Sequence, residues 1–380
     1  MIRATALLCS ILVPAVAAGE EWSLKIEGGS EYDSNPHRLE LPEQDSALVQ
    51  GAPLLRLGAR LRGMAKPQPR HSLRYSVFGG AKLFLEDTAE TEDVKILAAN
   101  ATYDVGVIAR RAVLRLAGSY YDAFGDDDAV SGRNFSSRDI QAALVLVGRG
   151  QHRVTAHVGL RSFEYKPNEQ FDWSGDHYGL RYNTSVWQGD TEGDANASSI
   201  DISASYRLER RNYNGVAFAS SCGEGDEIVG DCFYPTNVDR ADAHHAAAAE
   251  VSYTGNRIYS GRYELQVNDS NSVGQALVRH RFEVSITSEL FAEIILTAKG
   301  TVQYNVFLDP LLLAPDVNSQ SFVSIDDENR NGIVLHATRD LRSRLSVEGR
   351  YGFFSNEFAT QELRFRRQTG YLGLVYEYGD

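Results

Sequence analysis

Residues 72–86 read SLRYSVFGGAKLFLE, and apolar and polar side chains alternate along most of this stretch. Leu73, Tyr75 and Val77 fall on one face of an extended chain, whereas Arg74 and Ser76 fall on the other. A period of two is typical of a β-strand and not of a helix. The stretch therefore predicts a strand whose two faces meet different surroundings.

The same alternation recurs in about sixteen segments of the chain. We place their starts near Trp22, Pro53, Ser72, Val94, Ala112, Ser137, His152, His177, Ile200, Ala243, Arg257, Val273, Leu290, Gly332, Arg342 and Gln361. The polar faces carry charged residues in mid-strand, which a lipid-facing wall excludes and a water-filled lumen admits. We therefore predict an all-β fold, a single transmembrane antiparallel β-barrel of about sixteen strands.

The predicted connections alternate in length along the chain. Short ones include residues 66–69, 110–111 and 254–256, and long ones include residues 33–50, 122–136, 166–176, 214–242 and 307–331. Two connections break the pattern, because 189–199 is long for a turn and 269–272 is short for a loop. Barrels of this class have short periplasmic turns and longer extracellular loops. The alternation predicts that both termini are periplasmic and that the protein resides in the outer membrane of a Gram-negative cell.

The first residues resemble an export signal. Arg3 supplies a positive charge, residues 4–14 form a short apolar stretch, and small residues at 15–18 precede Gly19. This is the pattern of a cleavable signal peptide, and the apolar stretch is too short to cross a bilayer as a helix. We expect residues 1–18 to be the signal peptide and residues 19–380 to be the barrel domain.

The net charge of −13 argues against nucleic acid as a partner, because a phosphate backbone requires a basic face.

The last predicted strand keeps its alternation of outward and inward positions almost to the end of the chain, with Leu372, Leu374, Tyr376 and Tyr378 on one face. This ending resembles the signal that the barrel-assembly machinery reads, although two further residues follow the final aromatic. Outer-membrane lipid and lipopolysaccharide are the other partners that a barrel implies.

Basic residues on the predicted inner faces are candidates to line a pore. They are Arg56, Arg60, Arg62, Arg74, Lys82, Arg115, Arg207, Arg262, Arg279, Arg281, Lys299, Arg350, Arg364 and Arg366. A sixteen-stranded barrel leaves an aqueous interior unless something fills it. One interpretation is a basic stripe that conducts anionic or polyhydroxylated solutes, because arginine presents paired donors to carboxylate and phosphate. The other is a set of arginine–carboxylate pairs that stiffens the wall.

Cys222 and Cys232 lie ten positions apart in the longest predicted loop. In an oxidising compartment they predict a disulfide that closes a small surface loop. A metal site is the alternative, but two thiols without nearby histidines make a poor one.

A calcium-like motif begins at Asp327 and continues with Asn329 and Asn331. Thr338 stands where a calcium-binding loop has its final glutamate, which favours a solvated acidic loop. We expect no metal and no cofactor.

An outer-membrane hydrolase is a further hypothesis. His244 and His245, beside Asp242, form the only dense histidine cluster. Catalysis requires a nucleophile, a base and an orienting group that converge in space. The chain has neither a G-x-S-x-G nor an H-E-x-x-H motif, and we predict that it is not an enzyme.

The exit of the first predicted strand, Tyr32-Asp33-Ser34-Asn35, resembles a recurring start in a family of outer-membrane β-barrel porins linked to exopolysaccharide export. Residues 347–356 and 361–378 resemble the closing hairpin of that family. The resemblance implies a passive conduit for polysaccharide or other hydrophilic solutes, with periplasmic export components as partners and no catalytic residues. A structural or adhesive barrel with a closed lumen is the alternative.

Overall fold

The computed structural model describes residues 21–37, 41–42, 49–109, 111–125, 134–189, 198–221, 233–308, 331–357 and 363–379. Several predictions made from the sequence fall outside these ranges: the signal peptide at residues 1–18, the Cys222–Cys232 disulfide, and Asp327 and Asn329 of the calcium-like motif. The side chain of Arg364 is not described either. Among the described residues, no helix has the length and hydropathy needed to cross a membrane.

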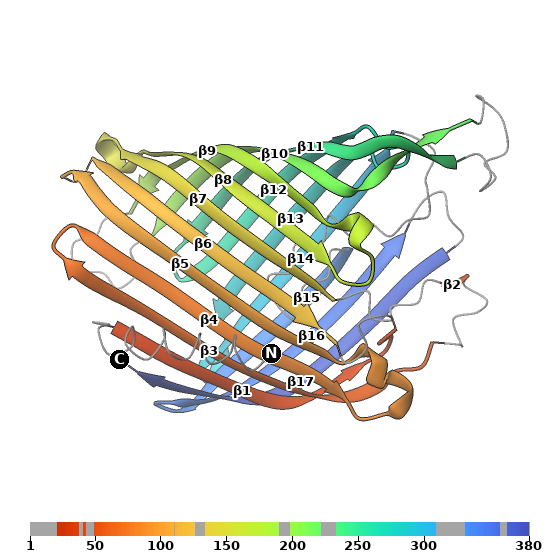
Figure 1. Cartoon of the computed structure of the whole chain (residues 1–380). Helices are drawn as coiled ribbons and strands as arrows, with labels where there is room; N and C mark the ends of the chain where they lie inside the picture. Colours follow the sequence, from red (N-terminus) through yellow and green to blue (C-terminus); the bar gives the residue numbers. More distant parts are fainter. Residues whose placement is uncertain are drawn as a thin grey trace.

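Sixteen long strands of the described chain form one closed antiparallel sheet (Figure 1). They are β1 (Glu21–Asp33), β3 (Ala52–Gln68), β4 (His71–Phe84), β5 (Val94–Ile108), β6 (Ala112–Phe124), β7 (Phe135–Val147), β8 (Arg153–Tyr165), β9 (Trp173–Gln188), β10 (Ser199–Ser220), β11 (Phe233–Thr254), β12 (Arg257–Ser270), β13 (Leu277–Glu289), β14 (Ile294–Phe307), β15 (Asn331–Arg342), β16 (Leu345–Glu357) and β17 (Leu363–Gly379). A two-residue strand, β2 (Leu41–Pro42), pairs with the start of β17. Short 3-10 helices occupy connections: η2 (Asp87–Glu92), η3 (Arg149–Gln151), η4 (Glu169–Phe171) and η6 (Phe291–Glu293).

Neighbouring strands pair in chain order, and the first long strand closes the barrel on the last. β1 pairs with β3 on one side and with β17 on the other, in a register that runs from Ser23 opposite Gly379 to Asp33 opposite Thr369. Closure leaves no free sheet edge, and every backbone polar group within a bilayer needs such an internal partner. The predicted antiparallel barrel of about sixteen strands is confirmed.

The two ends of the barrel differ. The terminal end is the one at which β1 begins and β17 ends, and its connections include the turns 69–70, 255–256 and 343–344. The opposite end, here called the loop end, carries the longer connections, such as 34–51 and 308–330. Both termini of the barrel therefore lie at the same end.

The predicted strand starts lie within four residues of the observed ones, except for β11. The sequence predicted a loop over residues 214–242, but β10 continues to Ser220 and β11 begins at Phe233. Register shifts near Asn212, Val216 and Phe218 interrupt this long hairpin. The hairpin extends past its neighbours, because β9 pairs with β10 only as far as Tyr213 and β12 pairs with β11 only from Asp242. The alternation of apolar and polar residues in the sequence is lost beyond that point. The prediction of a long loop was wrong for this reason.

The outer wall is apolar and exposed, as the alternation predicts. On β3, Leu55 and Leu57 are 41% and 51% exposed, while Arg56 between them is 3% exposed. The same contrast holds on β8, where Leu160 is 68% exposed, and on β17, where Leu372 is 66% exposed. A soluble protein rarely exposes so much contiguous apolar surface, whereas hydrocarbon solvates it.

Candidate functional site on the inner wall

Most of the predicted pore-lining cations lie on the strand faces opposite the exposed apolar residues. These are Arg56, Arg60, Arg62, Arg74, Lys82, Arg115, Arg207, Arg262, Arg279, Arg281, Lys299 and Arg350. Their shared face follows from strand parity, because successive side chains point to opposite sides of a sheet. These residues therefore face the lumen of the barrel.

Arg366 departs from the expectation. It lies an even number of positions from Leu372 and Leu374, which are exposed on the outer wall, and the register of β17 with β16 is unbroken. Arg366 is accordingly exposed, whereas Arg367 beside it is 3% exposed and points inward. The prediction that Arg366 points inward was wrong. Arg366 shares its strand face with Leu372 and Leu374, which could have been counted in the sequence.

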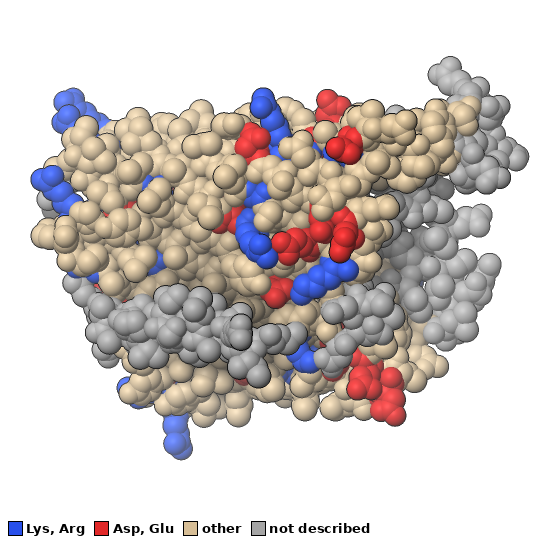
Figure 2. All heavy atoms as spheres, in the orientation of Figure 1, with Lys and Arg blue, Asp and Glu red and all other residues tan. Residues whose placement is uncertain are grey.

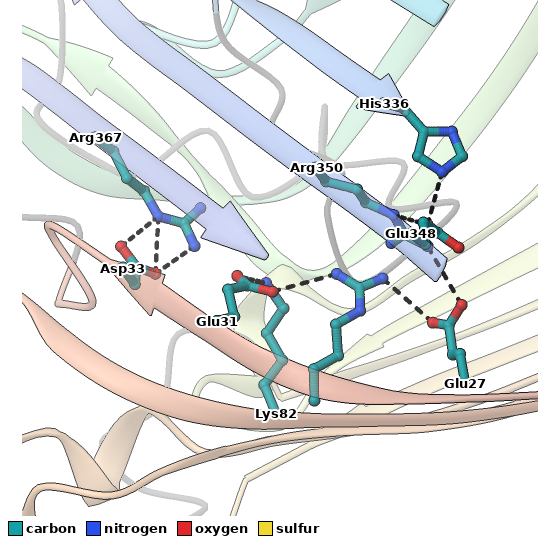
Figure 3. Close-up of polar contacts among 9 residues, drawn as sticks. Glu27, Glu31, Asp33, Lys82, His336, Glu348, Arg350 and Arg367 are labelled. Atoms are coloured by element: carbon teal, nitrogen blue, oxygen red, sulfur yellow. Dashed lines mark hydrogen bonds and ion pairs between the residues drawn. The ribbon is translucent and has the colours of Figure 1, made fainter. Parts of the chain in front are cut away.

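Where β1 closes the barrel, nine residues form a seam cluster on the inner wall, eight of which Figure 3 labels. They are Glu27, Glu31, Asp33, Arg56, Lys82, His336, Glu348, Arg350 and Arg367. On one side of β1, Glu31 accepts hydrogen bonds from Lys82 Nζ at 2.7 Å and Arg56 Nη1 at 3.4 Å. On the other side, Arg367 Nε donates to both carboxylate oxygens of Asp33, at 2.9 and 3.0 Å.

The seam cluster continues toward the terminal end. Glu27 lies 3.5 Å from Arg56 and 3.3 Å from Arg350, so that it links β3 to β16 across β1. Glu348 accepts from Arg350 and lies 2.7 Å from His336 Nε2. Charges removed from water need such partners, because an unpaired buried charge is costly. The seam is therefore lined by paired charges.

A second cluster, on β8 and β10, holds three guanidinium groups around one carboxylate. Glu209 is fully buried, and its oxygens lie 2.6 Å from Arg211, 3.6 Å from Arg161 and 3.8 Å from Arg207. One negative charge cannot balance three positive ones. Nearby, Arg240 is neutralised by Asp242, which also accepts from Asn268 and Ser270. The Glu209 cluster thus leaves a local excess of positive charge.

Next to this cluster, five aromatic side chains form a ladder across adjacent strands. Successive ring centroids are 5.2, 5.4, 6.1 and 6.5 Å apart along Tyr121, Phe135, Phe163, Trp173 and Tyr213, which come from β6 to β10 in order. Arg211 lies 4.8 Å over the Trp173 ring, and Arg240 lies 4.1 Å over the Tyr213 ring. Contacts of this kind stabilise a cation that is removed from water. The ladder fills the inner wall near the loop end.

Toward the terminal end the arrangement changes. Arg60 and Arg62 on β3, Arg153 on β8 and Arg181 on β9 make no ion pair with any described carboxylate. Arg181 donates to Asn183 at 2.9 Å, and Arg60 lies 5.0 Å over the Phe78 ring. A cavity of about 520 Å³ lies here, lined by Arg115, Gln151, Arg153, Thr155, Arg181, Asn183, Thr184, Ser185, Asp201, Ile202, Ser203, Glu250 and Ser252.

The sequence interpretations of a basic stripe and of a ladder of ion pairs thus apply to different parts of the wall. Ion pairs line the seam, whereas toward the terminal end the paired Arg74 and Arg115 lie on the same wall as arginines that make no ion pair with a described carboxylate. Sequence reasoning missed Arg153, Arg161, Arg181, Arg211, Arg240 and Arg367. For several the signal was present, because Arg161 and Arg181 each follow an exposed leucine, Leu160 and Leu180, and so fall on the inner face.

The two histidines that suggested catalysis point to opposite faces of β11. His245 is hydrogen-bonded to Tyr206 on the outer wall, with 2.7 Å between Tyr206 Oη and His245 Nδ1. His244 faces inward, and its Nδ1 is buried without a hydrogen-bond partner among the described atoms. Neighbours on a strand cannot converge on one reacting atom. The pair therefore does not form a catalytic unit.

No family model and no curated protein sequence matches this chain. Solved structures match in fold. OccAB1 from Acinetobacter baumannii aligns with a TM-score of 0.50 and 9% identity over 95% of this chain and 97% of that one. A BenF-like porin from Pseudomonas fluorescens Pf-5 aligns with a TM-score of 0.47 and 10% identity, over 95% and 98%. An anion-selective porin from Comamonas acidovorans aligns with a TM-score of 0.45 and 8% identity, over 94% and 98%.

The alignment with OccAB1 shows a shared fold and nothing about the solute. The closed sixteen-stranded sheet and its exposed apolar outer wall are the features of a transmembrane barrel. The chain therefore has the fold of an outer-membrane β-barrel, and its outer wall is suited to the outer membrane of a Gram-negative cell.

Proposed function

We propose that this barrel is a passive, non-enzymatic channel for small hydrophilic solutes that favours anions, with its terminal end in the periplasm. The observation that carries the proposal is the unneutralised positive charge on the inner wall. Arg60, Arg62, Arg153 and Arg181 have no carboxylate partner among the described residues, and Glu209 is shared by three arginines.

Unpaired arginines act on a solute because their field is not cancelled nearby. A charged lining with low-dielectric walls raises the local concentration of counter-ions. Guanidinium groups also present paired donors to carboxylate and phosphate oxygens. The hydroxyl and amide groups of Thr155, Asn183 and Ser203, which line the same cavity, add partners for a hydrated solute. Asp201 and Glu250 also line this cavity, so its lining holds three arginines and two carboxylates, and the excess of positive charge favours an anion over a cation.

The loop end supports small solutes rather than polymers. Inward side chains there pack against one another, since Arg56, Lys82, Trp173, Arg211 and Arg279 are each at most 5% exposed. Buried side chains occupy lumen volume that a polymer would need. We therefore propose small hydrophilic anions as the solutes, and we treat the polysaccharide conduit that the sequence resemblance implies as an outcome for experiment to decide.

The test is single-channel recording of the refolded full chain in a planar bilayer with a salt gradient. We expect a steady conductance and a reversal potential of the sign set by anions. Arg153→Gln combined with Arg181→Gln should shift the reversal potential toward that of cations. Arg366→Gln, on the outer wall, is the matched control and should leave it unchanged.

Absence of conductance would overturn the proposal and favour the structural or adhesive barrel with a closed lumen. The buried pairs and the aromatic ladder at the loop end are the observations behind that alternative. Conductance that an anionic polysaccharide blocks at low concentration, but that small sugar acids do not affect, would favour the export conduit instead.

A further inference from the structure

The outer wall carries one charged region that the channel proposal does not use. Figure 2 shows blue and red side chains gathered on an otherwise mostly tan wall, where the loop-end parts of β7 and β8 lie in Figure 1. By strand parity the outward-facing residues at the loop end of β6 to β10, with one from the following connection, include Asp122, Arg138, Glu164, Lys166, Asp176 and Arg210. We call these six residues the wall patch.

The three cations of the wall patch are exposed, and its three carboxylates are half-buried. Arg138 and Glu164 have exposed side-chain fractions of 57% and 46%, and their charged atoms are 3.2 Å apart. Lys166 Nζ lies 2.8 Å from Asp122, with exposed side-chain fractions of 32% and 21%. Arg210 is exposed opposite Asp176 in the register of β10 with β9. Exposed pairs of this kind contribute little to stability, so folding alone does not account for them.

The patch shortens the apolar band of the wall on one side of the barrel. On β8 the outward apolar positions run only from Val154 to Leu160, because Ser162 and Glu164 follow. Six residue steps of a tilted strand span about 16 Å, whereas the apolar band of an outer-membrane barrel is about 25 Å tall. On β14 the outward positions are apolar or aromatic from Leu296 to Val306, a span of about 26 Å by the same estimate.

At the loop end of β6 to β10, something polar must therefore replace hydrocarbon. Charged side chains facing acyl chains are destabilising, so the patch needs an occupant with charged or hydrogen-bonding groups. The patch offers three cations and three carboxylates in alternation. On the terminal-end side of the wall patch, Ile140 and Leu160 pair across β7 and β8 and are 71% and 68% exposed. Along these strands the outer wall is thus charged at the loop end and apolar nearer the terminal end.

We propose that the wall patch binds the phosphorylated headgroup of lipopolysaccharide in the outer leaflet. Arg138, Lys166 and Arg210 contact its phosphates, Asp122, Glu164 and Asp176 hold divalent cations that bridge to it, and its acyl chains lie along Ile140 and Leu160. Phosphate and guanidinium form paired hydrogen bonds, and carboxylates are suitable ligands for hard divalent cations. The proposal rests on the loop end being extracellular, as proposed above, but not on the lumen being open.

The experiment measures binding of purified lipopolysaccharide to the refolded full chain in uncharged detergent, in the presence of magnesium. We expect Arg138→Gln combined with Arg210→Gln to weaken binding at least tenfold. Arg366→Gln, an outward arginine at the loop end on the other side of the seam, should bind as the wild type does. Each variant is first checked for the heat-dependent gel shift of a folded barrel, and the double variant should keep the wild-type conductance.

Further arms separate the sources of the effect. Dephosphorylated lipopolysaccharide should bind as weakly as the double variant does to the phosphorylated form, and inorganic phosphate alone should not compete at millimolar concentration. Equal binding by wild type and double variant would overturn the proposal. It would also be overturned if light scattering showed a lipid-free oligomer that the double variant loses, because the occupant would then be a second copy of the chain. If the wild-type chain bound lipopolysaccharide but gave no conductance, the result would contradict only the proposal that the barrel is a channel.

Discussion

Glu31 on the inner wall illustrates how a single residue ties the barrel together. It is 4% exposed and bonds both Lys82 and Arg56, which come from β4 and β3. Two cations depend on this carboxylate, although Arg56 also approaches Glu27 at 3.5 Å. Paired charges in a buried position add little net stability, but loss of one partner leaves the others uncompensated.

We expect Glu31→Gln to lower the free energy of unfolding by about 3–5 kcal/mol, because the buried ammonium group of Lys82 and the guanidinium group of Arg56 each lose a charged partner. The measurement is urea unfolding of the barrel in phosphocholine vesicles, followed by tryptophan fluorescence. Arg74→Gln is the control, since Arg74 is 52% exposed and its partner Asp104 keeps Arg115. Arg74→Gln should lower the free energy of unfolding by at most about 1 kcal/mol. Equal effects of the two variants would show that the seam pairs on the inner wall are solvated rather than buried.

At the scale of elements, the aromatic ladder joins five consecutive strands. Each ring comes from the loop-end part of its strand, and the rings lie side by side only because β6 to β10 are in the observed register. Trp173 occupies the centre of the ladder and is 4% exposed, between Phe163 and Tyr213. The ladder is an apolar core inside a barrel whose inner wall is otherwise mostly polar.

Trp173→Ala should lower the free energy of unfolding by about 3–5 kcal/mol, because it removes a buried ring and leaves a cavity. Trp173→Phe keeps a ring between its neighbours and should cost less than half as much. Both variants are measured by urea unfolding followed by far-ultraviolet circular dichroism, which does not depend on the replaced tryptophan. If the alanine variant were as stable as the wild type, the ladder would be solvated rather than packed.

For the whole molecule, closure and charge are the two decisive properties. β17 pairs with both β16 and β1, and it supplies Arg367 to the seam cluster. Without it the barrel would have two open edges inside a bilayer, where unpaired backbone groups are costly. Closure is therefore a property of the complete set of strands.

A chain that lacks residues 363–380 should fail to give the compact, heat-modifiable band of a folded barrel on a gel. The control replaces residues 221–232 by an Asn-Gly turn. Ser220 and Phe233 are directly paired, so a two-residue hairpin turn joins them without a change of register. This control should still give the compact band. A compact band from the truncated chain would contradict the requirement for β17.

The amino-acid sequence was enough to predict most of the strands and the two faces of each one. Alternation is a local property of the chain, so the number of strands, the apolar outer wall and most of the inward cations could be predicted from it. It failed at residues 214–242, where the β10–β11 hairpin extends past its neighbours and register shifts interrupt the pairing. Arg366 was misplaced although its parity with Leu372 was readable in the sequence.

Which charges are neutralised depends on the fold of the whole chain. Asp33 and Arg367 are 334 positions apart, and Glu31 and Lys82 are 51 apart, yet closure and register bring each pair within 3 Å. Arg153 and Arg181 look like any other inward arginine in the sequence, but no described carboxylate lies close enough to pair with them. Pairing depends on cross-strand neighbours and side-chain reach, which a one-dimensional pattern does not contain. The distribution of free positive charge, and with it the proposed preference for anions, is therefore a property of the folded barrel.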